Sequence, residues 1–354
     1  MSRARDPHRS FFPFGNPFRM LSPKGSQMSS QLLGILNSFE ATLAERLKKL
    51  MPKNEDEIRS ISWMTLAMES LCETHNDIKT LALDIDLPVS DWDEKWIDVY
   101  LDISVKLLDI CIAFSSELSR LNQGHLLLQC ALHNLNTPSP QQFVRACSSI
   151  DGWRNHISSR NPRIEKCDTI LDNLLGSLDL PKVKNSAKGK VLMQAMYGVK
   201  VQTAFLCSVF AAVFSGSAEK LLGLDVADTY LWAQAFTSLR NVVNEEIKIK
   251  VRFSNGRFAV LKELEAVDAF VKKLYPIIQG EQDAVETEAL QKTVEETSRA
   301  AEKLSQGLDH LAKEVDGFFR VVLSGRDALL SSLRSGATFC DNIPRGTMDE
   351  QRVN

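Results

Sequence analysis

The sequence predicts an all-α protein, and three observations lead to that prediction. Apolar residues recur at steps of three and four through most of the chain, which is the spacing of one helix face. Gly (17) and Pro (12) are few for 354 residues, and the prolines fall mostly between the periodic segments. Val201–Ala218 carries no charge. We therefore expect a multi-helix bundle with a central apolar helix, a long C-terminal heptad helix, and disordered N- and C-terminal tails.

The first 29 residues are expected to form a basic tail rich in aromatic residues and proline. Asp6 is their single acid, against several arginines. Arg-rich, acid-poor N-termini are typical of transit peptides. The Phe11–Arg19 run also fits a docking peptide in which proline limits the entropy lost on ordering. A disordered tail that folds back on its own domain is the third interpretation.

The domain itself is expected to span residues 30–335, followed by a mobile tail at 336–354. Ser29 precedes a helical stripe, and Pro52 follows its end. Gly124 is expected to separate a long helix from a short one. The helices predicted before the central segment span 29–50, 55–83, 90–122, 125–135, 141–158 and 163–178.

The last helix has the most regular pattern in the chain. Leu290–Leu329 alternates apolar steps of four and three, with only Thr297 and Gly325 off-pattern. Such a seam binds either a second chain or the protein's own bundle. The many other helices that need partners, including those predicted at 228–251 and 258–275, favour packing within the chain.

Val201–Ala218 has two interpretations, a transmembrane span or a buried core helix. Eighteen helical residues rise about 27 Å, slightly less than a hydrocarbon core of about 30 Å. Gln202, Thr203 and several serines dilute its hydrophobicity, and Lys200 stands at its start. A bundle of one-faced helices needs one member that is apolar nearly all round. We therefore favour the buried core helix.

Basic residues form one local cluster, just before this segment. Lys182, Lys184, Lys188 and Lys190 could hold lipid phosphates at a membrane surface. The alternative is a solvated loop. The net charge of −3 gives no general attraction for nucleic acid, and no aromatic residue is interleaved for base stacking. We therefore expect no nucleic-acid partner.

The sequence contains none of the common catalytic signatures. There is no phosphate-binding GxxxxGK[ST] loop, GxGxxG turn, HExxH pair or GxSxG elbow. We accordingly predict a non-enzyme with no catalytic or cofactor-binding residues. An apolar metabolite bound between the helices around Phe205–Phe214, by a carrier or an enzyme, is the alternative.

Two Cys-x₂-His pairs have the residue types of a zinc site. Cys72 with His75 and Cys130 with His133 would each put a sulfur and an imidazole on one helix face. Small cysteines among apolar neighbours are also ordinary core residues, and we favour that interpretation, so no metal is predicted. Seven scattered cysteines without a CxxC pair indicate a reducing compartment.

Several long blocks resemble the plant BYPASS family. They are Phe11–Arg19, Ala44–Pro52, Ala67–His75, Leu87–Trp92 and Leu180–Ser186. The resemblance implies a plant developmental regulator of root and shoot growth that prevents excess of a root-derived mobile signal, thought to derive from carotenoid, which arrests the shoot. It implies no established catalysis, and therefore no catalytic residues to carry over.

The resemblance also implies a location and candidate partners. It implies a chloroplast protein, with the cytoplasm or a membrane surface such as the endoplasmic reticulum as alternatives. Through a related branch it implies exocyst-type subunits as candidate protein partners. A membrane tether, in which Val201–Ala218 inserts and the heptad helix recruits partners, is a third functional alternative.

Overall fold

The computed structural model describes residues 28–87, 94–136, 139–176, 186–253, 259–279 and 287–340, and within these ranges it contains helices and no strand. The predicted all-α class is therefore confirmed. The helices are α1 (Ser30–Lys49), α2 (Ile61–Asp84), α3 (Glu94–Leu135), α4 (Pro140–Ser158), α5 (Pro162–Gly176), α6 (Ala187–Ser215), the 3₁₀ turn η3 (Ala218–Lys220), α7 (Ala233–Phe253), α8 (Lys262–Gln279) and α9 (Thr287–Cys340).

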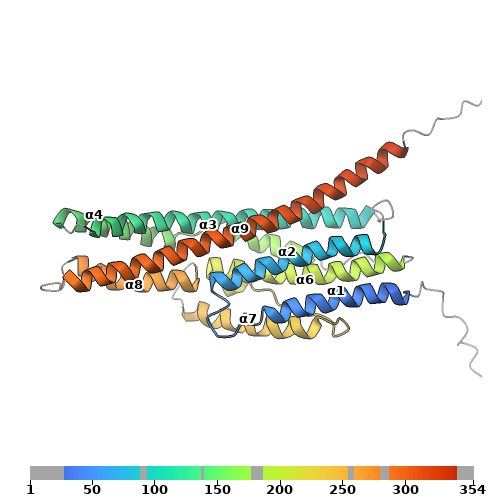
Figure 1. The fold of residues 1–354 in the computed structure, drawn as a ribbon, viewed down its shortest axis with the longest axis horizontal. Helices are drawn as coiled ribbons and strands as arrows, with labels where there is room; N and C mark the ends of the chain where they lie inside the picture. Colours follow the sequence, from blue (N-terminus) through green and yellow to red (C-terminus); the bar gives the residue numbers. More distant parts are fainter. Residues whose placement is uncertain are drawn as a thin grey trace, which may run out of the picture.

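Helix α9 runs along the length of the bundle, beside the long helix α3 (Figure 1). It packs against α3, α2 and α8. Its apolar seam is buried, with Leu308 and Val315 at 0% exposure. The off-pattern Thr297 is also fully buried, and its hydroxyl donates to the Thr293 carbonyl at 2.6 Å. The heptad seam thus packs within the chain, as predicted.

Helix α6 is the core of the molecule. It begins at Ser186, whose hydroxyl accepts from the Gly189 amide, and ends at Gly216 in the left-handed region (φ 65°). It packs against α1, α2, α5 and α7. By length and composition it could cross a membrane, but 94% of its most apolar window is buried inside the protein. The predicted central helix is therefore confirmed as a core helix, and Lys200 within it is also buried.

Helix α3 differs from the prediction because Gly124 does not interrupt it. A side-chain carbon at Gly124 would lie 3.2 Å from His156 and 3.7 Å from Trp153 of α4. Glycine costs about 1 kcal/mol in a helix, and here it allows α4 to approach closely. The predicted break was wrong because the glycine serves helix packing.

Other boundaries move by a few residues. Ser60 caps α2, so this helix starts at Ile61 instead of 55. Helix α7 starts at Ala233 instead of 228. Helix α8 runs from Lys262 to Gln279 instead of from 258 to 275, and Pro276 lies near its end. The expected C-terminal tail begins inside α9, because no proline stops this helix before 344. The N-terminal tail up to residue 27 and residues 341–354 lie outside the described residues.

Two buried charged side chains tie neighbouring helices together. Glu40 of α1 accepts from the Gln194 amide of α6 at 2.9 Å and from the backbone of Leu231 at 2.8 Å. Arg59, before α2, donates to the Val260 carbonyl at 2.8 Å and pairs with Glu265 of α8 at 2.9 Å. These contacts fix α1 on α6 and the start of α2 on α8.

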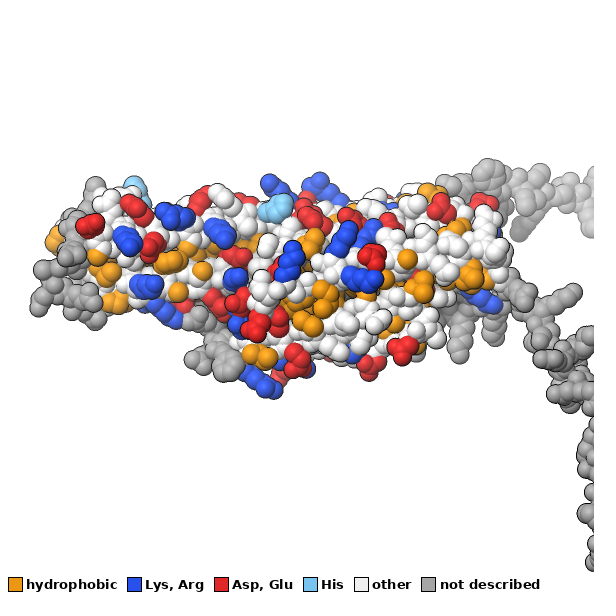
Figure 2. Space-filling view, turned by 60° about the horizontal axis from the view of Figure 1, so that its bottom comes forward, with side chains coloured by type: hydrophobic (Ala, Val, Ile, Leu, Met, Phe, Trp, Pro, Cys, Tyr) orange, Lys and Arg blue, Asp and Glu red, His pale blue; other side chains and the backbone are white. Residues whose placement is uncertain are grey.

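The surface over the lower part of the bundle carries acidic and basic side chains in mixed order, with smaller apolar areas between them (Figure 2). No extended region of a single sign is visible on this face. A single-sign basic face is the electrostatic footprint of a nucleic-acid-binding protein, and this face does not provide one.

Substitution of the α9 seam tests its role in the core. Leu308 is fully buried, so we expect Leu308→Ala to lower the free energy of unfolding by about 2–5 kcal/mol. Leu126→Ala is the matched control because Leu126 is 62% exposed, and its effect is expected within about 0.5 kcal/mol. Chemical denaturation measures both. Equal effects of the two substitutions would contradict burial of the seam.

Candidate functional site

An apolar cavity lies between α2, α3, α6 and α9, with Leu174 of α5 at its edge. Its volume is about 380 Å³, which falls within the range of 300–1,000 Å³ typical of small-molecule sites. Leucine, isoleucine, valine, methionine and alanine side chains form most of its wall. This is a ligand-sized space beside the central helix.

Small residues on α9 make room for the cavity. Ser324, Gly325 and Ala328 line it, and of these Gly325 stands at a seam position where the heptad pattern would place a larger side chain. The hydroxyl of Tyr100 from α3 lies over Gly325, since a side-chain carbon there would be 2.5 Å from Tyr100 Oη. Gly325, the off-pattern residue of the seam, therefore leaves room for the Tyr100 hydroxyl.

His75 of α2 lines the cavity and bonds across it to α6. Its Nε2 lies 3.0 Å from Thr203 Oγ1, and the Thr203 hydroxyl donates to the Val199 carbonyl at 2.7 Å. Because the single hydroxyl proton is used there, Thr203 accepts from His75, so Nε2 carries the imidazole proton. The ring also makes an edge contact with Phe318 of α9. His75 thus links three helices.

Burial keeps the His75 ring neutral. Desolvation, and to a smaller extent the nearby Lys79 charge, lowers the pKa of His75 to about 4. His75 is half-buried, and part of its surface lies in the apolar wall of the cavity, where water solvates the ring poorly. His75 is a neutral hydrogen-bond donor at physiological pH.

The charged groups at the cavity are basic. Lys79 of α2 and Lys200 of α6 line it together with His75, and no aspartate or glutamate does so among the described residues. The Lys79 ammonium donates to the Val321 carbonyl of α9 at 3.2 Å, and burial lowers the pKa of Lys79. The cavity is therefore apolar with a positive bias.

Arg326 closes the α3 side of the site. Its guanidinium donates to the Leu101 carbonyl at 2.9 Å and to Ser104 Oγ at 3.0 Å. Ser104 is itself part of the cavity wall. These bonds hold α9 against α3 beside the cavity.

The region around Phe205–Phe214, where the alternative prediction places a ligand, is filled by side chains. These residues are buried and pack against each other and their neighbours, with Phe210 stacked on Phe114 and Phe205 against Phe236. The cavity instead adjoins the preceding turns of α6, from Leu192 to Ala204. Phenylalanine fills space, so the room for a ligand lies where the side chains are smaller.

The two Cys-x₂-His pairs do not converge. Cys72 and His75 lie on α2, whereas Cys130 and His133 are exposed near the end of α3. No group of metal-ligating atoms among the described residues includes any of the four. The zinc arrangement is therefore not formed, because α2 and α3 do not bring these positions together.

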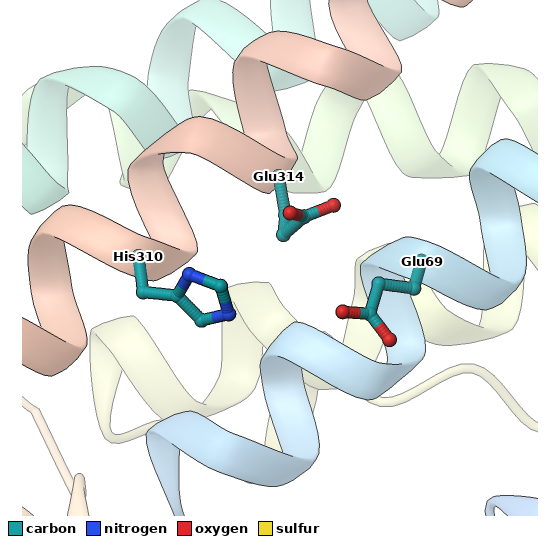
Figure 3. Close-up of side chains that lie close together, drawn as sticks. All are labelled: Glu69, His310 and Glu314. Atoms are coloured by element: carbon teal, nitrogen blue, oxygen red, sulfur yellow. The ribbon is translucent and has the colours of Figure 1, made fainter.

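A different trio of ligating side chains lies where α2 faces α9. The side chains of Glu69, His310 and Glu314 converge from the two helices (Figure 3), with ligand atoms within 4.8 Å of one another. Burial raises the pKa of Cys72 to about 11, and the charges of Glu314 and Glu69 add to this. The trio could hold a divalent cation, but His310 is exposed, and exposed acidic groups are common without one.

Only part of the lysine cluster lies within the described residues. Lys182 and Lys184 fall outside them. The Lys188 ammonium donates to the Asp86 carbonyl at 2.7 Å and lies 3.7 Å from its carboxylate. Lys188 therefore joins the start of α6 to the end of α2, and Lys190 is half-buried.

Sequence reasoning missed Lys79, Tyr100 and Arg326. One signal was available, because Gly325 interrupts an otherwise regular heptad and marks a place where α9 cannot fill its groove. Nothing in the sequence shows that Tyr100 lies opposite this glycine.

Fold and site define an all-α bundle protein with a ligand-sized cavity beside its core helix. The chain belongs to the ROH1-like family, whose family model matches residues 19–146 and 167–333. No solved structure gives a significant match.

Three plant proteins are similar to this chain over most of its length. Protein BPS1, chloroplastic, of Arabidopsis thaliana is 59% identical over 336 residues, covering 95% of this chain and 94% of that protein. UPF0496 protein 4 of Oryza sativa subsp. japonica is 46% identical over 88% of this chain and 69% of its own. Protein ROH1D of Arabidopsis thaliana is 21% identical over 87% of this chain and 90% of that protein. The BYPASS resemblance is confirmed, and with it a plant developmental regulator of this family.

The buried imidazole predicts a pH dependence of stability. The folded pKa of about 4 lies below the ordinary 6.5, so the stability contributed by neutral His75 is complete above pH 6.5 and is lost as the pH falls toward 4. Relative to His75→Phe, the native protein should lose up to about 3 kcal/mol of unfolding free energy over this window. Denaturation at several pH values measures the difference between the two proteins.

The control for this experiment is His133→Phe, since His133 is exposed on α3. Its difference from the native protein should not vary over the same pH window. A pH-independent difference for His75→Phe would show that the ring is not held neutral.

Proposed function

We propose that this chain restrains a root-derived mobile signal that arrests shoot growth, and that it does so by binding and not by catalysis. The observation that carries the proposal is the 59% identity to Protein BPS1 over nearly the full length of both chains. None of the relatives described above has an enzyme name, which supports a non-catalytic role.

The place of action belongs to the same proposal. The relative named chloroplastic supports a chloroplast location for this chain. Protein partners, exocyst-type subunits among them, and a membrane surface reached through Lys188 and Lys190 remain proposals. Insertion of α6 into a membrane is disfavoured, because it would separate α6 from the helices that bury it.

Grafting tests the regulatory role. In a plant that lacks this gene, a root stock should arrest a normal shoot grafted on it, because the restrained signal moves upward. A normal root stock under a mutant shoot is the reciprocal control and should permit growth. Restoring the gene in the root should remove the arrest. Normal growth of shoots on mutant roots would contradict the proposal.

A second candidate function is a carrier for an apolar metabolite. The apolar cavity between α2, α3, α6 and α9 favours it, because such a space with a few polar groups is the usual form of a small-molecule site. A carrier of this kind could act within the first proposal by sequestering a metabolite.

Retention of a ligand tests the second candidate. Native protein purified from plant tissue should release an apolar small molecule on denaturation, detected by mass spectrometry. Ala328→Trp should lose it, because the indole would occupy the cavity wall. Ala289→Trp makes the same change on α9 at an exposed position outside the cavity and should retain it. An empty native protein would count against a carrier.

A further inference from the structure

We propose that the cavity binds an amphipathic organic anion, with an apolar body lying along α6 and a carboxylate held at the corner formed by Lys79, Tyr100 and Gly325. This inference rests on the second candidate function and names the chemical class of its ligand. The basic side chains of the cavity wall, the position of its polar groups and its apolar remainder support this ligand class.

The charge of the wall selects an anion. Lys79, Lys200 and His75 line the cavity, and no acidic side chain among the described residues does. Charges interact more strongly where water is scarce than in bulk solvent. A cationic ligand would therefore be repelled by the two lysines, whereas a carboxylate would be attracted to them.

The polar groups converge at one corner. From the position of a side-chain carbon at Gly325, Tyr100 Oη lies 2.5 Å away and Lys79 Cε 3.4 Å away. Lys79 uses one of its three ammonium protons on the Val321 carbonyl. Its other donors and the Tyr100 hydroxyl remain suited to an oxygen acceptor. Because Gly325 has no side chain, the Tyr100 hydroxyl has room beside Lys79 at this corner.

The rest of the wall suits a hydrocarbon body. Leu192, Met196 and Val199 of α6 face Leu107 of α3 and Val322 of α9 across the space. These side chains offer no hydrogen bonds, so a ligand with polar groups along its length would lose its contacts with water and gain none. One polar end and one apolar body is the arrangement that matches both regions.

Paired fluorescent probes test the charge of the head group. cis-Parinaric acid and parinaryl alcohol share one apolar body and differ in the head. The full-length native protein should bind the acid about tenfold or more tightly than the alcohol in a titration. Lys79→Met should remove this preference by weakening the acid and leaving the alcohol unchanged, and Lys79→Arg should keep it.

Further variants separate a binding effect from a folding defect. Tyr100→Phe removes the hydroxyl from the same corner and should weaken the acid selectively. Lys313→Met removes an exposed lysine of α9 outside the cavity and should change neither affinity. Circular dichroism confirms that each variant is folded.

The outcomes distinguish this inference from the function on which it rests. Equal binding of acid and alcohol, unchanged in Lys79→Met, would overturn the anion and leave an apolar carrier. Binding of neither probe to the folded native protein would overturn both. Acid binding that falls equally in Lys79→Met and Lys313→Met would place the acid on the surface and overturn the site.

Discussion

Burial of α6 is the constraint on which the rest of the structure depends. Because this helix is enclosed on nearly all sides, α1, α2, α5 and α7 must each turn an apolar face toward it. Its polar side chains then have to find partners inside the protein. The Gln202 amide donates to Ser70 of α2 at 3.0 Å, and Ser208 donates to the Phe205 carbonyl at 2.7 Å. The Gln202 bond fixes the rotation of α6 against α2, and the Ser208 bond satisfies its hydroxyl within α6, since an unpaired polar group would cost about 1–3 kcal/mol in this core.

The cavity follows from the way α9 meets this core. Helices α3 and α9 run side by side along the bundle, and the C-terminal part of α9 rises away from the other helices (Figure 1). The α9 residues at the cavity lie in the C-terminal half of the helix, from Val321 to Ser332. Gly325 takes a seam position there, and Tyr100 Oη of α3 lies where its side chain would stand. Arg326 and Lys79 bridge the divergence by hydrogen bonds to α3 and from α2.

The fold could be predicted from the sequence to a large extent, and the site could not. Helical periodicity, serine caps and the uncharged stretch are local signals, so the bundle, its central helix and the heptad helix were predicted correctly. The helix break predicted at Gly124 was wrong because the glycine allows α4 to approach α3 closely. This tertiary contact leaves no signal in the sequence. The cavity depends on which residues meet across four helices, and Lys79, Tyr100 and Gly325 are far apart in sequence. The zinc alternative for the two Cys-x₂-His pairs is not formed for the same reason: spacing along one helix does not say which helix lies opposite.

Residues that a maximally stable helix bundle would not contain are informative when several of them lie in one place. A glycine within a helical seam and a lysine within the core helix are residues that such a bundle seldom uses. Both, Gly325 and Lys200, line the same cavity, and Lys79 lies in the same wall. Each departure also has local contacts, as Gly325 has with Tyr100, Lys79 with the Val321 carbonyl and Gly124 with α4. Natural sequences break the rules of packing chiefly at functional sites. The concentration of such residues at this cavity therefore argues that it is there to bind something, independently of its volume.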